Sequence, residues 1–173
     1  LGMLSSGYKT IACAGTHGKT TTSSMVSHLL NTSEVKCQAF LGGIARNFDS
    51  NLLISETSHY LVVEADEYDR SFLHLHPDIA IITSIDSDHL DIYETYDAIK
   101  EAFTEFTANI VPDGCLIIKK GLGLLLNSQA EYKVYSYAVN EDADFYATNL
   151  QIENGLYHFD FIYPHGSVKN FIL

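Results

Sequence analysis

Basic residues are scarce in this 173-residue sequence, with ten Lys and Arg against 22 Asp and Glu and a net charge of −12. Nucleic-acid binding needs a positive surface, so this charge argues against a nucleic-acid partner. Long apolar runs are also missing, since a membrane-spanning helix needs roughly 20 such residues. The first residues show no basic start followed by an apolar stretch, as a signal peptide would. We therefore expect a cytoplasmic protein that has no membrane partner.

Cysteine is almost as rare. Cys13, Cys37 and Cys115 are odd in number, widely spaced and outside any CxxC pattern. This argues against a disulfide framework or a zinc site, and favours reduced thiols in a cytosolic protein. Hydrophobic residues make up 46% of the chain, which is enough to build the core of one domain.

Several segments carry the periodicity of regular elements. Two near-continuous apolar runs, at 59–65 and 78–84, are typical of strands buried on both faces of a parallel sheet. We expect further strands at 8–14, 115–119 and 132–138, and helices at 18–31, 95–110 and 121–130. The second of these helices has one apolar stripe, formed by Ile99, Ala102, Phe103, Phe106 and Ile110.

The pattern changes near residue 143. Apolar and polar residues then alternate, and the sequences "ENG" and "PHG" mark turns, with Asn154-Gly155 a strong hairpin signal. The sequence therefore predicts an α/β fold. It should have a mainly parallel sheet with flanking helices, and a small antiparallel β patch at 143–173.

The segment "GTHGKT" at 15–20 lies at the predicted strand–helix junction. It lacks the first glycine of the general GxxxxGK[ST] pattern, because Cys13 stands at that position. Gly15 and Gly18 still allow the backbone amides to approach an anion at the positive end of the following helix. Lys19 adds a full charge, and the Thr20 hydroxyl can bind Mg²⁺. We predict a phosphate-binding loop rather than a plain glycine turn.

Two buried strands run into acidic segments, "LVVEADEYD" and "IAIITSIDSDHLD". Parallel strands place their carboxyl ends in one crevice, so both segments should lie near the phosphate loop. Mg²⁺ takes a few carboxylates together with phosphate oxygens and water. Glu64 is the expected protein ligand, and the neutral imidazole of His89 could serve a second metal. Either segment taken alone could instead be a solvated loop or a helix cap.

Residues 8–118, with "GTHGKTTT" and "EADEYDRSFLHLHPDIAIITSIDSDHLDIY", resemble the central ATP-binding domain of the Mur ligases. The resemblance implies that Lys19 binds the β- and γ-phosphates of ATP. It also implies that Thr20 and Glu64 bind Mg²⁺, that His89 binds a second metal, and that Lys19, Glu64 and His89 act in catalysis. The nucleotide-binding residues would be Gly15, Thr16, His17, Gly18, Lys19, Thr20 and Thr21.

The implied activity is ATP-dependent joining of a carboxylate to an amine through an acyl phosphate. The histidine in "GTHGKT" favours two family members. One joins L-alanine to UDP-N-acetylmuramate, and the surrounding motifs favour it. The other recycles murein peptides by attaching a tripeptide, and it remains an alternative. ATP and Mg²⁺ are the implied cofactors, with UDP-N-acetylmuramate and L-alanine as partners of the full-length enzyme.

The family also implies parts that these residues lack. Its members have an N-terminal UDP-binding domain, an adenine-contacting helix and a C-terminal amino-acid-binding domain. We therefore expect 1–173 to be a fragment, inactive alone and truncated before the end of its central domain.

Two rival classes lack their signatures. A small-molecule phosphate-loop kinase would need an arginine-rich lid, yet arginine occurs only at Arg46 and Arg70. A GTP-dependent switch would carry the base-reading motif NKxD, and this sequence has none.

Overall fold

A computed structural model of the chain describes residues 2–86, 93 and 95–173. Its helical elements are α1 (Gly2–Ser5), α2 (Lys19–Thr32), the 3₁₀ turn η1 (Ser71–His74) and α4 (Tyr96–Ala108). Its strands are β1 (Lys9–Ala14), β2 (Gln38–Ala45), β3 (Ser50–Leu53), β4 (Tyr60–Ala65), β5 (Ile79–Ile82), β6 (Cys115–Lys119), β7 (Lys133–Val139), β8 (Phe145–Glu153), β9 (Leu156–Tyr163) and β10 (Gly166–Ile172). No helix in these ranges combines the length and the apolar character needed to cross a bilayer.

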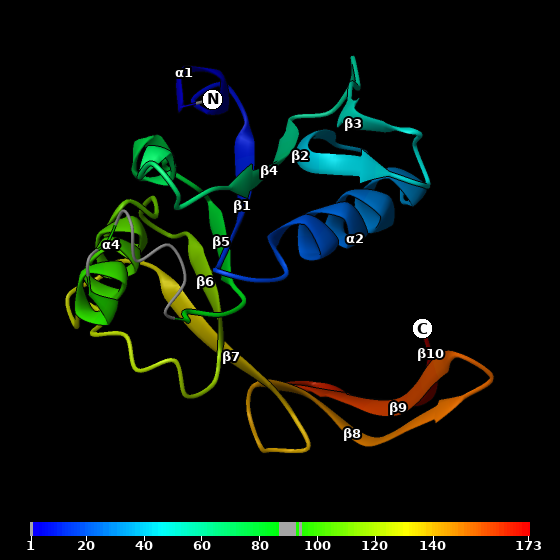
Figure 1. The fold of residues 1–173 in the computed structure, drawn as a ribbon. Coiled ribbons are helices and arrows are strands. Elements are labelled where there is room, and N and C mark those ends of the chain that lie inside the picture. The colour runs from blue at the N-terminus through cyan, green and yellow to red at the C-terminus, as the bar shows by residue number, and fades with distance from the viewer. Residues whose placement is uncertain (1, 87–92, 94) are drawn as a thin grey trace.

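The strands form one sheet in the order β10-β9-β8-β7-β6-β5-β1-β4-β2-β3. The seven strands from β2 to β8 in this order pair in parallel, and β3, β9 and β10 add antiparallel edges. This confirms the predicted α/β class with an antiparallel patch, which continues the main sheet below α2 in the view of Figure 1. The predicted hairpin is also confirmed, because Asn154 (φ 52°) and Gly155 (φ 81°) link β8 to β9.

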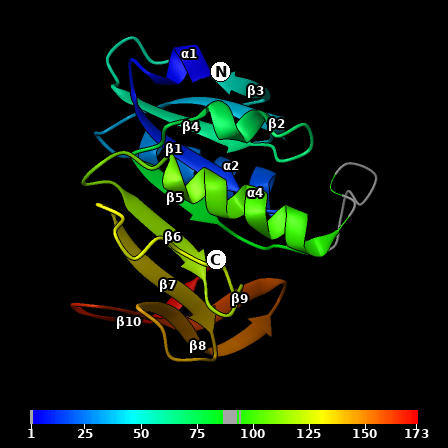
Figure 2. The same cartoon turned by 90° about the vertical axis from the view of Figure 1, so that its left-hand side faces the viewer.

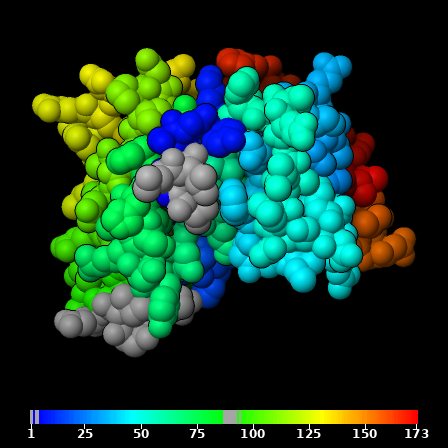
Figure 3. All heavy atoms as spheres, turned by 90° about the horizontal axis from the view of Figure 1, so that it is seen from above, coloured from blue at the N-terminus to red at the C-terminus, as the bar shows by residue number. Residues whose placement is uncertain are grey.

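The two long helices cover opposite faces of the parallel strands, as Figures 1 and 2 show. On one face, the predicted apolar stripe is buried against residues of β1, β4, β5 and β6, although its last member, Ile110, lies beyond the end of α4. On the other, Ser23 and Ser27 of α2 are buried, and Val26 and Leu30 pack against the cluster around Val62. In the space-filling view of Figure 3, the N-terminal residues (blue) lie between the β2–β3 segment (cyan) and the green part of the chain, which includes α4.

The predicted helix at 121–130 is wrong, since that segment is irregular and extended. Gly121 (φ 85°) and Gly123 (φ 65°) have left-handed backbone conformations that interrupt a helix. Leu122, Leu124 and Leu126 instead alternate inward with a period of two and pack against the α4 core. No element was predicted for 33–58, where the structure has β2 and β3.

Removal of one ring from this core should be costly. Phe103 of α4 is fully buried, and its ring packs edge-on against that of Phe72, with the ring centroids 5.3 Å apart. Phe103→Ala should therefore lower the free energy of unfolding by about 3–5 kcal/mol, because it removes apolar burial and leaves a cavity. Urea denaturation of the 173-residue chain measures this loss, with exposed Glu105→Ala as the control on the same helix. A Phe103→Ala loss no larger than that of the control would contradict the packing.

Candidate phosphate-binding site

The loop between β1 and α2 has a shape that needs its two glycines. Gly15 has a φ of 138°, and a Cβ there would lie 2.1 Å from Thr83 Oγ1. Gly18 has a φ of 82° and forms the N-cap of α2. Side chains at these positions would meet strain, and at Gly15 also a clash, so the backbone conformation of this loop favours glycine at both.

Two hydroxyl residues that follow β5 hold this loop, and the sequence analysis missed both. The Thr83 hydroxyl donates to Ala14 O (3.1 Å) and to His17 O. The Thr16 amide donates to the carbonyl oxygen of Ser84 (3.1 Å), and the His17 amide donates to the Ser84 hydroxyl oxygen (2.8 Å). Short hydroxyl residues directly after a buried strand were the available signal. These bonds turn the amides of Thr16 and His17 toward β5.

The start of α2 offers a second set of amides. Its N-cap residue is Gly18, which has no side chain to cap this end. The first N–H groups of a helix have no partner within it, and the helix dipole makes this end positive. A cavity of about 460 Å³ opens here. It is lined by Thr16, His17, Gly18, Lys19, Thr20, Thr21, Glu64, Asp66 and Tyr68. All seven predicted nucleotide-binding residues except Gly15 therefore line one cavity, which is suited to an anion.

Lys19 lines this cavity, and its ammonium group forms an ion pair with Glu67. Its Nζ donates to both carboxylate oxygens of Glu67, at 2.9 and 2.8 Å, and lies 3.8 Å from Asp66 Oδ1. The Glu67 side chain is 1% exposed and that of Lys19 is 12% exposed. From the sequence, Glu67 was predicted only to be one of several acidic residues after β4. Nothing in the pattern "EADEYD" shows which of these side chains turns inward.

Glu64, at the carboxyl end of β4, faces the same cavity. The Thr20 hydroxyl donates to Glu64 Oε1 (2.9 Å), and the Gly42 amide of β2 donates to Oε2 (2.7 Å). In the described part of the chain, no three His, Cys, Asp or Glu side chains gather closely enough to hold a metal ion. Mg²⁺ is usually held by one or two carboxylates together with phosphates and water, so the Thr20–Glu64 pair fits it.

The second acidic segment reaches the loop as predicted for parallel strands. The Asp86 amide donates to Thr16 Oγ1 (3.0 Å), and Asp86 Oδ2 lies 3.7 Å from His17 Nε2. His89, the predicted second metal ligand, lies outside the described residues, so its assignment stays a prediction.

Cys13 lies under the site and is not a nucleophile. Burial, and then the charge of Glu64, raise the pKa of its thiol to about 12. Its side chain is fully buried and remains protonated near neutral pH. The site therefore has the groups to bind and orient an anion, and this cysteine adds no covalent chemistry.

Gly42 offers a sharp test of the Glu64 position. A Cβ at Gly42 would lie 2.5 Å from Glu64 Oε2, whereas at Gly43 the nearest atom is Thr20 Cγ2 at 3.4 Å. The carboxylate can swing away, so Gly42→Ala should keep the fold and displace Glu64, the predicted metal ligand. We expect Mg²⁺-dependent nucleotide affinity to fall about tenfold, in the range seen when metal-supporting contacts are lost. Titration with a fluorescent nucleotide measures it, and equal loss in Gly43→Ala would contradict the assignment.

The glycine loop, the uncapped helix and the lysine, all at the carboxyl end of a central parallel strand, define an α/β protein of the phosphate-loop type. A family model described as the Mur ligase middle domain matches residues 13–172. The chain belongs to the Mur ligase family, as its motifs predicted.

Curated relatives agree with this assignment. The UDP-N-acetylmuramate–L-alanine ligase of Parabacteroides distasonis is 54% identical over 164 residues, which cover 95% of this chain and 36% of the relative. The ligase of the same name from Flavobacterium johnsoniae is 48% identical over 170 residues, covering 98% of this chain and 36% of the relative. The chain thus spans about a third of the length of these relatives.

Solved structures share the fold. A UDP-N-acetylmuramate:L-alanyl-gamma-D-glutamyl-meso-diaminopimelate ligase from Neisseria meningitides is 24% identical, with a TM-score of 0.80 over 95% of this chain and 55% of that one. The MurF ligase of Thermotoga maritima, solved in complex with ADP, is 18% identical, with a TM-score of 0.76 over 96% of this chain and 40% of that one. At these identities the likeness establishes the fold alone.

Proposed function

We propose that this chain is the ATP-binding domain of a longer ligase that joins L-alanine to the carboxylate of UDP-N-acetylmuramate. The relatives' names support the reaction, and their length supports the presence of flanking domains that hold the UDP group and the amino acid. The observation that carries the proposal is the single cavity onto which Lys19, Glu64 and the uncapped start of α2 converge.

Each side chain has a defined task in this proposal. The amides at the start of α2 and the Lys19 ammonium bind the phosphates of ATP. Thr20 and Glu64 would hold Mg²⁺, which supplies charge neutralisation when it is bound. The ADP complex of the MurF ligase supports a nucleotide as the ligand. His89 remains the proposed ligand of a second metal.

The proposed reaction has two balanced steps. The muramate carboxylate attacks the γ-phosphorus of ATP, the bond to the bridging oxygen breaks, and ADP leaves. The alanine amine then attacks the acyl carbon, loses a proton and displaces inorganic phosphate. Phosphoryl transfer needs positioning and charge stabilisation rather than a protein nucleophile, which agrees with the neutral, buried Cys13.

Isotope transfer tests this function. The full-length ligase, given ATP, Mg²⁺, L-alanine and UDP-N-acetylmuramate with an ¹⁸O-labelled carboxylate, should release phosphate that carries one ¹⁸O. Unlabelled phosphate alongside normal amide formation would exclude the acyl phosphate. Labelled phosphate with the tripeptide but not with L-alanine would assign the chain to the murein-peptide-recycling branch. The 173-residue chain alone should bind nucleotide weakly and form no amide.

A further inference from the structure

We propose that Glu67 is a positioning residue for the phosphate-binding lysine: its buried carboxylate holds the Lys19 ammonium from the interior side, so that the remaining N–H of the ammonium faces the cavity. This inference rests on the proposed function, because it assigns Glu67 a role in ATP binding and phosphoryl transfer. Nothing in the family motifs assigned a role to this carboxylate.

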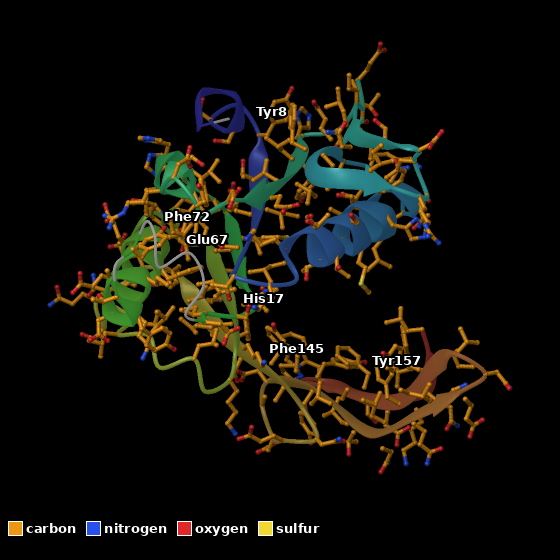
Figure 4. The ribbon with its side chains drawn as sticks, viewed as in Figure 1. Tyr8, His17, Glu67, Phe72, Phe145 and Tyr157 are labelled. Carbon is orange, nitrogen blue, oxygen red and sulfur yellow. The ribbon has the colours of Figure 1, made fainter. Side chains whose placement is uncertain are left out.

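The geometry of the ion pair supports this orientation. A lysine ammonium has three N–H donors, and two of them are directed to Glu67 Oε1 and Oε2 at 2.9 and 2.8 Å. Lys19 lines the cavity, whereas Glu67 does not. In the view of Figure 4, Glu67 lies between Phe72 of the core and His17 of the loop. The Glu67 carboxylate therefore holds the ammonium from behind, and its cavity side, where Asp66 Oδ1 lies 3.8 Å from Nζ, is left to a phosphate oxygen.

Glu67 is itself fixed, as a positioning group must be. Its carbonyl oxygen accepts from the Arg70 amide (3.0 Å) and from the Tyr93 hydroxyl. Tyr93 is 2% exposed, and the Arg70 guanidinium lies over its ring at 5.3 Å. Burial, followed by the charge of Glu67, raises the pKa of Tyr93 to about 12, so the phenol keeps the proton that it donates.

The ion pair with Glu67 fixes the position of the Lys19 ammonium but weakens its attraction for the phosphates. A lysine side chain has many accessible rotamers, and Glu67 removes much of that freedom before the nucleotide arrives. The carboxylate also cancels part of the positive charge that the phosphates meet. Loss of the carboxylate charge should therefore leave nucleotide affinity equal or tighter, while the lysine loses the position required in the transition state.

The test compares Glu67→Gln with Asp69→Asn in the full-length ligase. Both replace a carboxylate by an amide in the same loop, but Asp69 is exposed and lies outside the cavity lining. In Glu67→Gln, kcat should fall about 10- to 100-fold, as expected for a misplaced group, while the Kd for ATP stays within about threefold of the parent or tightens. Asp69→Asn should keep the parental kcat and Kd.

A second measurement uses the unfolding of the 173-residue chain without nucleotide. Lys19→Ala should lower the urea midpoint, because it leaves a buried carboxylate unpaired, and adding Glu67→Gln should raise the midpoint again. Parental kcat in Glu67→Gln, equal losses of kcat and ATP affinity, or no recovery in the double variant would overturn the inference. If the parent itself forms no amide and binds no ATP, the proposed function fails instead.

Discussion

Lys19→Ala in the full-length ligase is expected to reduce amide formation by about 10³-fold or more. Negative charge develops on the γ-phosphoryl oxygens, and the variant loses the fixed cation that stabilises it. Lys19 is the cation that lines the cavity at the start of α2, next to amides that carry only partial charges. Coupled detection of released phosphate and mass spectrometry of the amide product measure the effect.

The same substitution has a structural cost that must be separated from the chemical one. Glu67 is 1% exposed, and without Lys19 its charge would be buried without this partner. Removal of one partner of a buried pair costs about 3–5 kcal/mol. The double variant Lys19→Ala/Glu67→Gln is the control, because it should recover stability without recovering activity. Recovery of turnover in the double variant would show that Lys19 has no chemical role.

Glu64→Ala is expected to lower turnover by at least about 100-fold and to raise the Mg²⁺ concentration needed for half-maximal activity. The Glu64 carboxylate lines the cavity and touches the Thr20 hydroxyl at 2.9 Å, so its removal takes away the charged half of the proposed metal pair. A steady-state titration with Mg²⁺ at saturating ATP measures both changes.

Asp69→Ala is the matched control for this prediction. Asp69 lies five residues after Glu64, in the loop that follows β4, and accepts from the Ser71 amide at 2.9 Å. Hydrogen bonds from Ser71 lower the pKa of its carboxyl, so Asp69 is also a charged carboxylate near neutral pH. Equal losses in the two variants would place the metal ligand at another acid.

Much of the candidate site could be predicted because its parts are contiguous in sequence. The segment 15–20 forms the loop, and the acid at the end of a buried strand, Glu64, lies across from it. Thr83, Ser84 and Gly42 escaped prediction because their contacts to the loop and to Glu64 span 22 or more residues. A local pattern can mark such residues, but it does not show which distant segment they contact.

The fold shows the same division. The α4 stripe was predicted residue by residue, because burial on one face of a helix imposes a 3.6-residue period. The leucines at 122, 124 and 126 were misread as a helix, since a run of leucines favours a helix until the glycine conformations are known. Their period of two reflects packing against the α4 core, which is a tertiary constraint.

The parallel α/β class, the phosphate-loop motif and the family follow from the amino-acid sequence alone, because short-range periodicity and the fixed spacing of glycine, lysine and acidic residues indicate them. Tertiary contacts are what select the acid of "EADEYD" that turns toward the cavity and the one that is buried. Glu64 faces Thr20 and Gly42, whereas Glu67 is enclosed with Lys19. A buried carboxylate needs a partner that offsets its lost hydration, and here that partner is Lys19, which lies 48 residues earlier in the chain.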